Sequence, residues 1–169
     1  MTPLLLVANA GSSSLKFALF KKNEADQPVA DATGQVEGIG TQPRFTVKDA
    51  AGETLFDRAH DPDEVLHHGG AIAVIRSWVH ERDRGATLLA VGHRVVHGQH
   101  FSEPVLVDTK VLTKLEALVP LAPLHQPQCL ARHPRGARCY ADAAADRMKS
   151  GLFEFWSDFY CISLSGRTL

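Results

Sequence analysis

The sequence lacks a run of roughly 18 or more apolar residues, so no membrane-spanning helix is expected. The apolar stretch at the N-terminus is short and has no basic residues before it, unlike a secretory signal peptide. An excess of one charge is also missing: the formal net charge is -1, so no basic field would attract nucleic acid or a membrane surface. These absences favour a cytoplasmic location, with neither a membrane nor a nucleic acid as partner.

Cysteine is scarce and lacks the spacing of a disulfide framework, which favours a reducing compartment. The three cysteines are Cys129, Cys139 and Cys161. Together with His133, the first two do not have the spacing of a zinc site. His93 and His97 would share one face of a strand, but the sequence supplies no third ligand for a catalytic metal. A metal site built from histidine or cysteine is therefore not expected.

The chain does contain a series of short apolar segments separated by turn residues. Strands are expected at residues 4–8, 15–20, 29–36, 44–47, 53–57 and 87–96, and helices at 60–84 and 108–119. Asp61 followed by Pro62 is typical of a helix start, and Gly69-Gly70 is a weak point inside that helix. The first two strands are joined too tightly for a crossover, so they should pair antiparallel in a mixed α/β fold.

The segment NAGSSSLKF, residues 9–17, joins the first two strands. Consecutive backbone N–H groups in a Gly/Ser turn can converge on an anion, and Lys16 adds a positive charge suited to phosphate. The segment matches neither the Walker P-loop nor the Rossmann glycine fingerprint. Two interpretations stay open at this point, a phosphate cradle and an ordinary polar turn.

Two further segments combine apolar residues with groups that could bind a ligand. Arg94 lies inside the apolar VGHRVVHG, where a guanidinium is costly unless it is paired. Its planar fork suits a carboxylate ligand and equally an Asp or Glu of the same chain. PLAPLHQP, residues 120–127, is stiffened by proline. It presents Leu124 and His125 either to a small apolar pocket or as part of a connector.

Together these segments resemble the acetate and propionate kinase family over residues 4 to about 128. LLLVANAGSSSLKFALF is similar to the family's opening strand-loop-strand. VGHRVVHG with the following FSEPVLVD is similar to the second family motif, and PLAPLHQP to the third. Gln126 stands where the family usually has asparagine. The motifs occur in the family's order, and their combination carries the resemblance.

The resemblance implies an α/β, actin-like and sugar-kinase-like ATPase fold of the ribonuclease H type, with only the N-terminal domain represented. It implies an acetate kinase that transfers a phosphoryl group from ATP to acetate, giving acetyl phosphate and ADP, with Mg²⁺ as cofactor. Asn9 then corresponds to a residue near Mg²⁺ and phosphate, and Arg94 to the arginine that binds the acetate carboxylate. The resemblance also implies that Ser12, Ser14 and Lys16 contact the ATP phosphates. It implies that Val96 and Leu124 contact the acetate methyl group and that His125 lies near the active site.

The sequence departs from the family after about residue 128, where its composition changes. The family's essential aspartate and histidine have no counterpart here. Asp142, Asp146 and Asp158 stand in the wrong context to replace that aspartate. We therefore expect an incomplete acetate kinase-like domain at 1–128 and an unrelated or frameshifted, poorly ordered tail at 129–169. Such a chain should be inactive alone and should lack the part through which this homodimeric family is expected to dimerise. Sequencing the locus tests a disrupted frame near codon 129.

Three other functions stay open. One is a phosphate- or carboxylate-binding remnant without turnover. Another is a kinase for propionate or butyrate, since one methylene changes discrimination by only ~1–3 kcal/mol. The third is an interaction partner of a full-length kinase, through an aromatic patch in the tail formed by Phe153, Phe155, Trp156, Phe159 and Tyr160.

Overall fold

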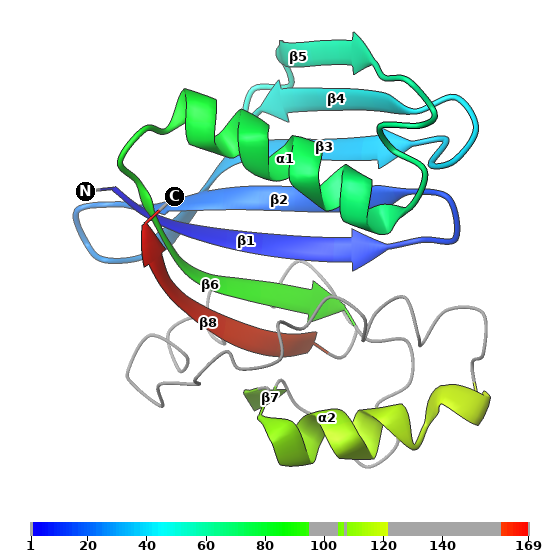
Figure 1. The fold of residues 1–169 in the computed structure, drawn as a ribbon. Helices are drawn as coiled ribbons and strands as arrows, with labels where there is room; N and C mark the ends of the chain where they lie inside the picture. Colours follow the sequence, from blue (N-terminus) through cyan, green and yellow to red (C-terminus); the bar gives the residue numbers. More distant parts are fainter. Residues whose placement is uncertain (1, 95–104, 107, 122–159, 169) are drawn as a thin grey trace.

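One eight-stranded sheet organises the fold in a computed structural model, which describes residues 2–94, 105–106, 108–121 and 160–168 (Figure 1). The strands are β1 (Pro3–Ala10), β2 (Leu15–Lys22), β3 (Pro28–Glu37), β4 (Arg44–Asp49), β5 (Thr54–Ala59), β6 (Thr87–Arg94), β7 (Val105–Leu106) and β8 (Tyr160–Thr168). The helices are α1 (His68–Arg82), α2 (Thr109–Glu116) and the short 3-10 helix η1 (Val119–Leu121). The strand order across the sheet is β5-β4-β3-β2-β1-β6-β8-β7.

The first five strands form an antiparallel meander, and β6 then joins β1 in parallel. The antiparallel pairing predicted for the first two strands is confirmed, because the loop between them is too short for a crossover. The chain passes through α1 before it reaches β6, as a parallel connection requires. Ala8 of β1 pairs with His93 of β6, so the carboxyl ends of these two strands lie side by side.

Helix α1 covers one face of the meander and closes the main hydrophobic core (Figure 1). Three aromatic rings fill its centre: the ring centroids of Phe17 and Phe45 are 6.1 Å apart, and Trp78 of α1 lies 6.3 Å and 6.2 Å from them. Fully buried aliphatic side chains surround the rings, namely Leu4, Leu19, Val36, Val47 and Val65. Because side chains alternate along a strand, the residues between these core positions point to the opposite face of the sheet.

An ion-pair cluster fastens the end of α1 to β2 and β3. Lys21 Nζ lies 3.2 Å from Asp31 and 2.9 Å from Asp83, and Arg82 Nη1 lies 2.7 Å from Asp31. These four side chains are partly buried, so their charges are screened less than those of an exposed pair. The cluster therefore holds the helix in register on the sheet.

The start of α1 is the main correction to the sequence prediction. Asp61 was expected to cap this helix, but it opens a single turn, in which its carbonyl accepts the N–H of Val65 at 3.2 Å. Val65 is fully buried in the core, and its own carbonyl accepts the N–H of Gly40 at 2.9 Å. That carbonyl is therefore not available to continue a helix, and α1 begins only at His68.

The second predicted helix begins where the sequence indicates. The Asp108 carboxylate accepts the backbone N–H of Val111 at 2.7 Å, which caps the first turn of α2. Leu115 and Leu118 form a small core of their own beside this helix. Of the predicted tail at 129–169, the structure describes Tyr160–Thr168, which pairs antiparallel with β6 as β8. The remainder of that tail lies outside the described residues.

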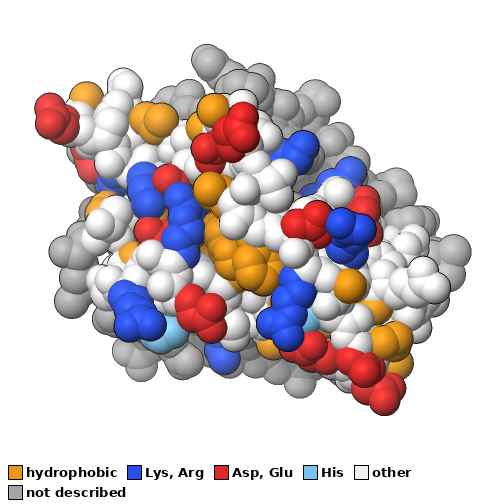
Figure 2. Space-filling view, turned by 90° about the horizontal axis from the view of Figure 1, so that it is seen from above, with side chains coloured by type: hydrophobic (Ala, Val, Ile, Leu, Met, Phe, Trp, Pro, Cys, Tyr) orange, Lys and Arg blue, Asp and Glu red, His pale blue; other side chains and the backbone are white. Residues whose placement is uncertain are grey.

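The surface seen in Figure 2 carries acidic and basic side chains intermixed around a limited apolar area. This mixture fits the nearly balanced charge of the sequence. No helix within the described residues is long and apolar enough to cross a membrane.

Candidate functional site

The loop between β1 and β2 is held in shape by hydrogen bonds from two other parts of the chain. Within the loop, the N–H of Gly11 donates to the carbonyl of Ser14 at 2.8 Å. The N–H of Ile39, in the β3–β4 loop, donates to the carbonyl of Ser13 at 3.0 Å. His68, the first residue of α1, places Nε2 2.8 Å from the carbonyl oxygen of Gly11. The loop is therefore a supported structure rather than a free hairpin tip.

The same loop leaves several hydrogen-bond donors available. In the part of the chain that the structure describes, the backbone N–H groups of Ser12, Ser13 and Ser14 donate to no acceptor. Ser12 and Ser13 are exposed. A Cβ at Gly11 would lie 2.7 Å from Ser14 Oγ, so the Ser14 hydroxyl packs directly against this glycine. Successive unpaired N–H groups in a tight turn form the kind of concavity that binds anions.

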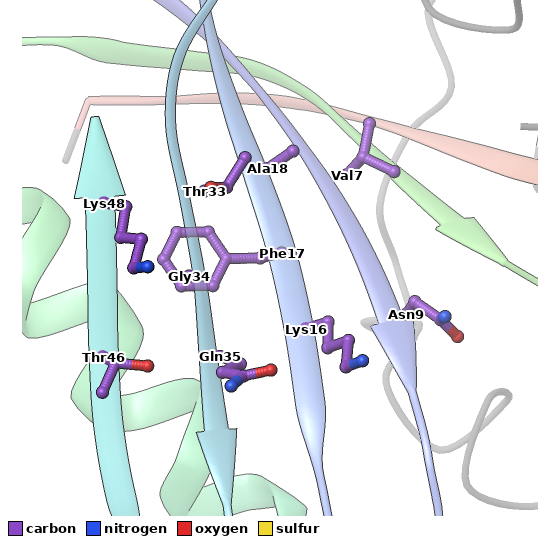
Figure 3. A pocket seen from close by; sticks show the side chains of 10 residues that line it. All are labelled: Val7, Asn9, Lys16, Phe17, Ala18, Thr33, Gly34, Gln35, Thr46 and Lys48. Atoms are coloured by element: carbon purple, nitrogen blue, oxygen red, sulfur yellow. The ribbon is translucent and has the colours of Figure 1, made fainter. Parts of the chain in front are cut away.

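A row of polar side chains crosses four strands beside this loop, on the face of the sheet opposite α1. The strand registers place Asn9 opposite Lys16, Lys16 opposite Gln35, and Gln35 opposite Thr46. Figure 3 shows the four side chains on one face, with Lys16 extending from β2 toward β1 and Asn9. Since neighbouring strands lie about 4.8 Å apart, the row spans roughly 14 Å.

A second row lies one step along the strands, and together the two rows line an open hollow of about 350 Å³ (Figure 3). In register, Ala18 is opposite both Val7 and Thr33, and Thr33 is opposite Lys48. Phe17 and Gly34 complete the lining, although the Phe17 ring itself packs in the core against Phe45 and Trp78.

The hollow is electropositive because its lining carries lysines and no acidic side chain. Among the described residues, neither Lys16 nor Lys48 forms an ion pair. In contrast, Lys21 and Lys22 on the same strand as Lys16 are both paired with aspartates. Two exposed lysines without a carboxylate partner leave their charge available for an anionic ligand.

The structure brings one set of the predicted site residues together, whereas most of the other set lies outside the described residues. Asn9, Ser12, Ser14 and Lys16 all lie at the carboxyl end of β1 and the start of β2. Arg94 is the last residue of β6, so its backbone ends at the same edge of the sheet, next to β1. Predicted site residues that lie outside the described residues are Val96, Leu124 and His125. The three aspartates judged unable to replace the family's essential aspartate, Asp142, Asp146 and Asp158, also lie outside them.

Sequence reasoning missed four residues that the structure adds to this region: Gln35, Thr46, Lys48 and His68. Alternation along the third and fourth strands could have placed Gln35, Thr46 and Lys48 on the solvent face. Their position beside Lys16 depends on the pairing registers of β2, β3 and β4, which the sequence pattern did not supply. His68 was inside the predicted helix, and nothing in the sequence indicated its contact with Gly11.

The donor atoms of the hollow suit an anion better than a resident metal ion. Within the described part of the chain, no three His, Cys, Asp or Glu side chains come together. Mg²⁺ is usually bound through carboxylates, substrate phosphates and water. Asn9, the expected metal contact, supplies a single amide oxygen beside a lysine. These residues do not by themselves form a magnesium site.

The described strands and helix have the arrangement that was predicted, the N-terminal part of an actin-like, sugar-kinase-like ATPase fold. Its elements are the β1–β2 hairpin, the parallel strand β6 and helix α1 between them. The sequence model of the Acetokinase family matches residues 4–133. The chain therefore belongs to the acetokinase family, which confirms the resemblance drawn from its three motifs.

Curated relatives agree with this assignment. The chain is 43% identical over 127 residues to an acetate kinase of Nitrobacter hamburgensis, covering 75% of this chain and 31% of that protein. It is 46% identical over 128 residues to an acetate kinase of Rhizobium meliloti, covering 75% and 32%. A propionate kinase of Yersinia enterocolitica is 36% identical over 126 residues, covering 74% and 29%. The chain thus spans about a third of the length of the relatives it matches.

Proposed function

We propose that this chain carries the phosphate-binding part of an acetate kinase-type phosphotransferase. The reaction moves the terminal phosphoryl group of ATP to the carboxylate of acetate, giving acetyl phosphate and ADP. The observation that supports this most is the pairing of Asn9 with Lys16 beside the unpaired N–H groups of the Ser12–Ser14 turn. Under the same proposal the partners are ATP and acetate, and the location is the cytoplasm.

Charge is the main difficulty in this reaction, because both reactants are anionic. Acetate is ionised at neutral pH and needs no strong base to become a nucleophile. Two unit charges ~4 Å apart repel by roughly 4 kcal/mol at an effective dielectric near 20. The lysine and N–H donors offset that repulsion and fix the direction of the phosphate chain. Mg²⁺, when bound to the nucleotide, would neutralise further phosphate charge.

The acetate side of the proposal depends on residues matched to the family motifs. Arg94 would hold the acetate carboxylate through two parallel hydrogen bonds, and its backbone position at the edge next to β1 supports this role. Val96 and Leu124 would enclose the methyl group, with His125 nearby. A pocket of this kind discriminates acetate from propionate only weakly, and the likeness to a propionate kinase supports testing both acids.

A hydroxamate assay tests the proposal, because hydroxylamine converts acetyl phosphate to acetohydroxamate, which forms a coloured complex with ferric iron. The purified chain is given ATP, Mg²⁺ and either acetate or propionate, and ATP binding is measured in parallel by calorimetry. Turnover that is lost in both Lys16→Ala and Arg94→Ala would mean that the chain is an enzyme by itself. Binding without turnover would favour the second candidate, a phosphate-binding remnant. Folded protein that neither binds ATP nor turns over would overturn the proposal.

A further inference from the structure

Lys48 is the feature of the hollow that neither the family motifs nor the proposed reaction accounts for. It lies on β4, in the second row of the hollow, two strands away from Lys16. Its side chain is exposed and forms no ion pair with any described residue. A second unpaired lysine in a hollow without acidic lining is a second place where negative charge is stabilised.

The two lysines are too far apart, and point in directions too different, to share one phosphate. Strand β3 lies between them, so their backbones are roughly 10 Å apart across the sheet. Figure 3 shows Lys16 extending toward β1, whereas Lys48 extends toward β3 and the middle of the hollow. An anion that contacts both must therefore be extended.

The surface between the two lysines suits the oxygens of such an anion. Gln35 and Thr33, both on β3, line the floor, and Thr46 lies beside Lys48 on β4. An amide and two hydroxyls can donate hydrogen bonds to phosphate oxygens without adding negative charge. The hollow is also open to solvent on the face opposite α1, so a chain of phosphates can lie along it.

We infer that Lys48 and Lys16 form a two-cation site for a linear di- or triphosphate, which extends from the Ser12–Ser14 turn across β3. The inference rests on the proposed function, since it takes the turn and Lys16 as one end of the site. Its ligand is recognised through the phosphate chain, and this chain can belong to a nucleotide or to inorganic polyphosphate.

Calorimetry on the purified full chain tests the inference with orthophosphate, pyrophosphate and tripolyphosphate as probes. Affinity should rise with phosphate number in the unmodified protein. Lys48→Ala should weaken tripolyphosphate binding by about fivefold and change orthophosphate binding by no more than about twofold. Lys48→Arg should restore the affinity, because the positive charge is retained. Lys110→Ala removes the same charge from the exposed face of α2 and should have no effect.

Two results would overturn the inference while leaving the proposed function intact. One is equal affinity for all three anions. The other is a Lys48→Ala variant that binds tripolyphosphate normally while Lys16→Ala does not. Failure of the folded protein to bind any of the three anions would overturn both.

ATP and AMP, as further probes, identify the source of the phosphate chain. Equal binding of ATP and tripolyphosphate with weak binding of AMP supports recognition through phosphate alone. Equal binding of ATP and AMP would place recognition on the nucleoside and would contradict the inference.

Discussion

Asn9 and Lys16 are direct partners across the β1–β2 pair, and both project into the hollow on the open face of the sheet. Their backbone hydrogen bonds fix this relationship, because a slip of one residue would turn either side chain to the core face. The amide and the ammonium are therefore held together without any bond between the side chains themselves. A small rigid pair of this kind is well suited to orient a phosphate at the end of a strand.

Loss of Lys16 should abolish most of the affinity of the chain for ATP. We expect Lys16→Ala to weaken binding at least about tenfold, because a charge-assisted hydrogen bond contributes roughly 1.5–3 kcal/mol. Asn9→Ala should weaken it less, since the amide is uncharged. Calorimetry at two ionic strengths measures both effects, and Lys110→Ala serves as the charge-matched control on α2. Unchanged affinity in Lys16→Ala would remove the lysine from the site.

His68 should act on phosphate binding through the loop that it supports. Its Nε2–H donates to the carbonyl of Gly11, so His68→Ala removes a link between α1 and the Ser12–Ser14 turn. We expect ATP affinity to fall by about threefold to tenfold, with a smaller loss of stability. Amide hydrogen exchange at Gly11 and Ile39, whose N–H groups donate to carbonyls of this loop, should become faster at the same time, which a purely global destabilisation would not produce selectively.

His80→Ala is the matched control, since His80 is an exposed histidine on the same helix. If His68→Ala and His80→Ala bind ATP equally well, the contact with Gly11 has no part in forming the site.

Gly34 should tolerate no side chain. A Cβ at this position would lie 2.5 Å from Phe17 Cε1 and 2.7 Å from the backbone oxygen of Thr46. The strand oxygen cannot move without breaking the β3–β4 ladder, so Gly34→Ala should cost about 1–3 kcal/mol of the free energy of unfolding.

Urea denaturation compares this variant with Gly92→Ala. Gly92 is likewise a strand glycine, and it is buried, but its Cβ would meet Val7 at an ordinary 3.6 Å. We expect Gly92→Ala to stay within about 0.5 kcal/mol of the parent protein. Equal unfolding midpoints for the two variants would show that the sheet relaxes around Gly34.

The parts of the fold that the sequence predicted well are those fixed by short-range geometry. The β1–β2 hairpin follows from its short loop, and the start of α2 follows from the Asp108 cap. The same short loop places two predicted site residues, Asn9 and Lys16, opposite each other.

The missed features depend on contacts between distant parts of the chain. Asp61 has every local property of a helix cap, but burial of Val65 and its hydrogen bond to Gly40 end the turn. Gly70, predicted as a weak point, sits in the first turn of α1, where a Cβ would lie 2.6 Å from the carbonyl oxygen of Glu64. Lys48 reaches the hollow only through the β3–β4 register.

The exposed pair of Arg44 and Asp57 should make the stability of the β4–β5 hairpin depend on pH in the acid range. Arg44 donates from Nε and Nη2 to the two carboxylate oxygens of Asp57, both at 2.7 Å. Hydrogen bonding to Arg44 lowers the pKa of Asp57 below its ordinary 3.8. The unfolded chain therefore takes up a proton on this carboxylate at a higher pH than the folded chain does.

It follows that the pair stabilises the fold fully above pH 3.8 and that this contribution is lost as the pH falls through the lowered pKa. Asp57→Asn should lower the urea midpoint slightly at neutral pH, and the gap to the parent protein should close in acid. The effect should be small and weaker at high salt, because both groups are exposed. Glu53→Gln, which removes an exposed carboxylate from the same hairpin, is the control. A gap that widens as the pH is lowered would contradict the assigned sign.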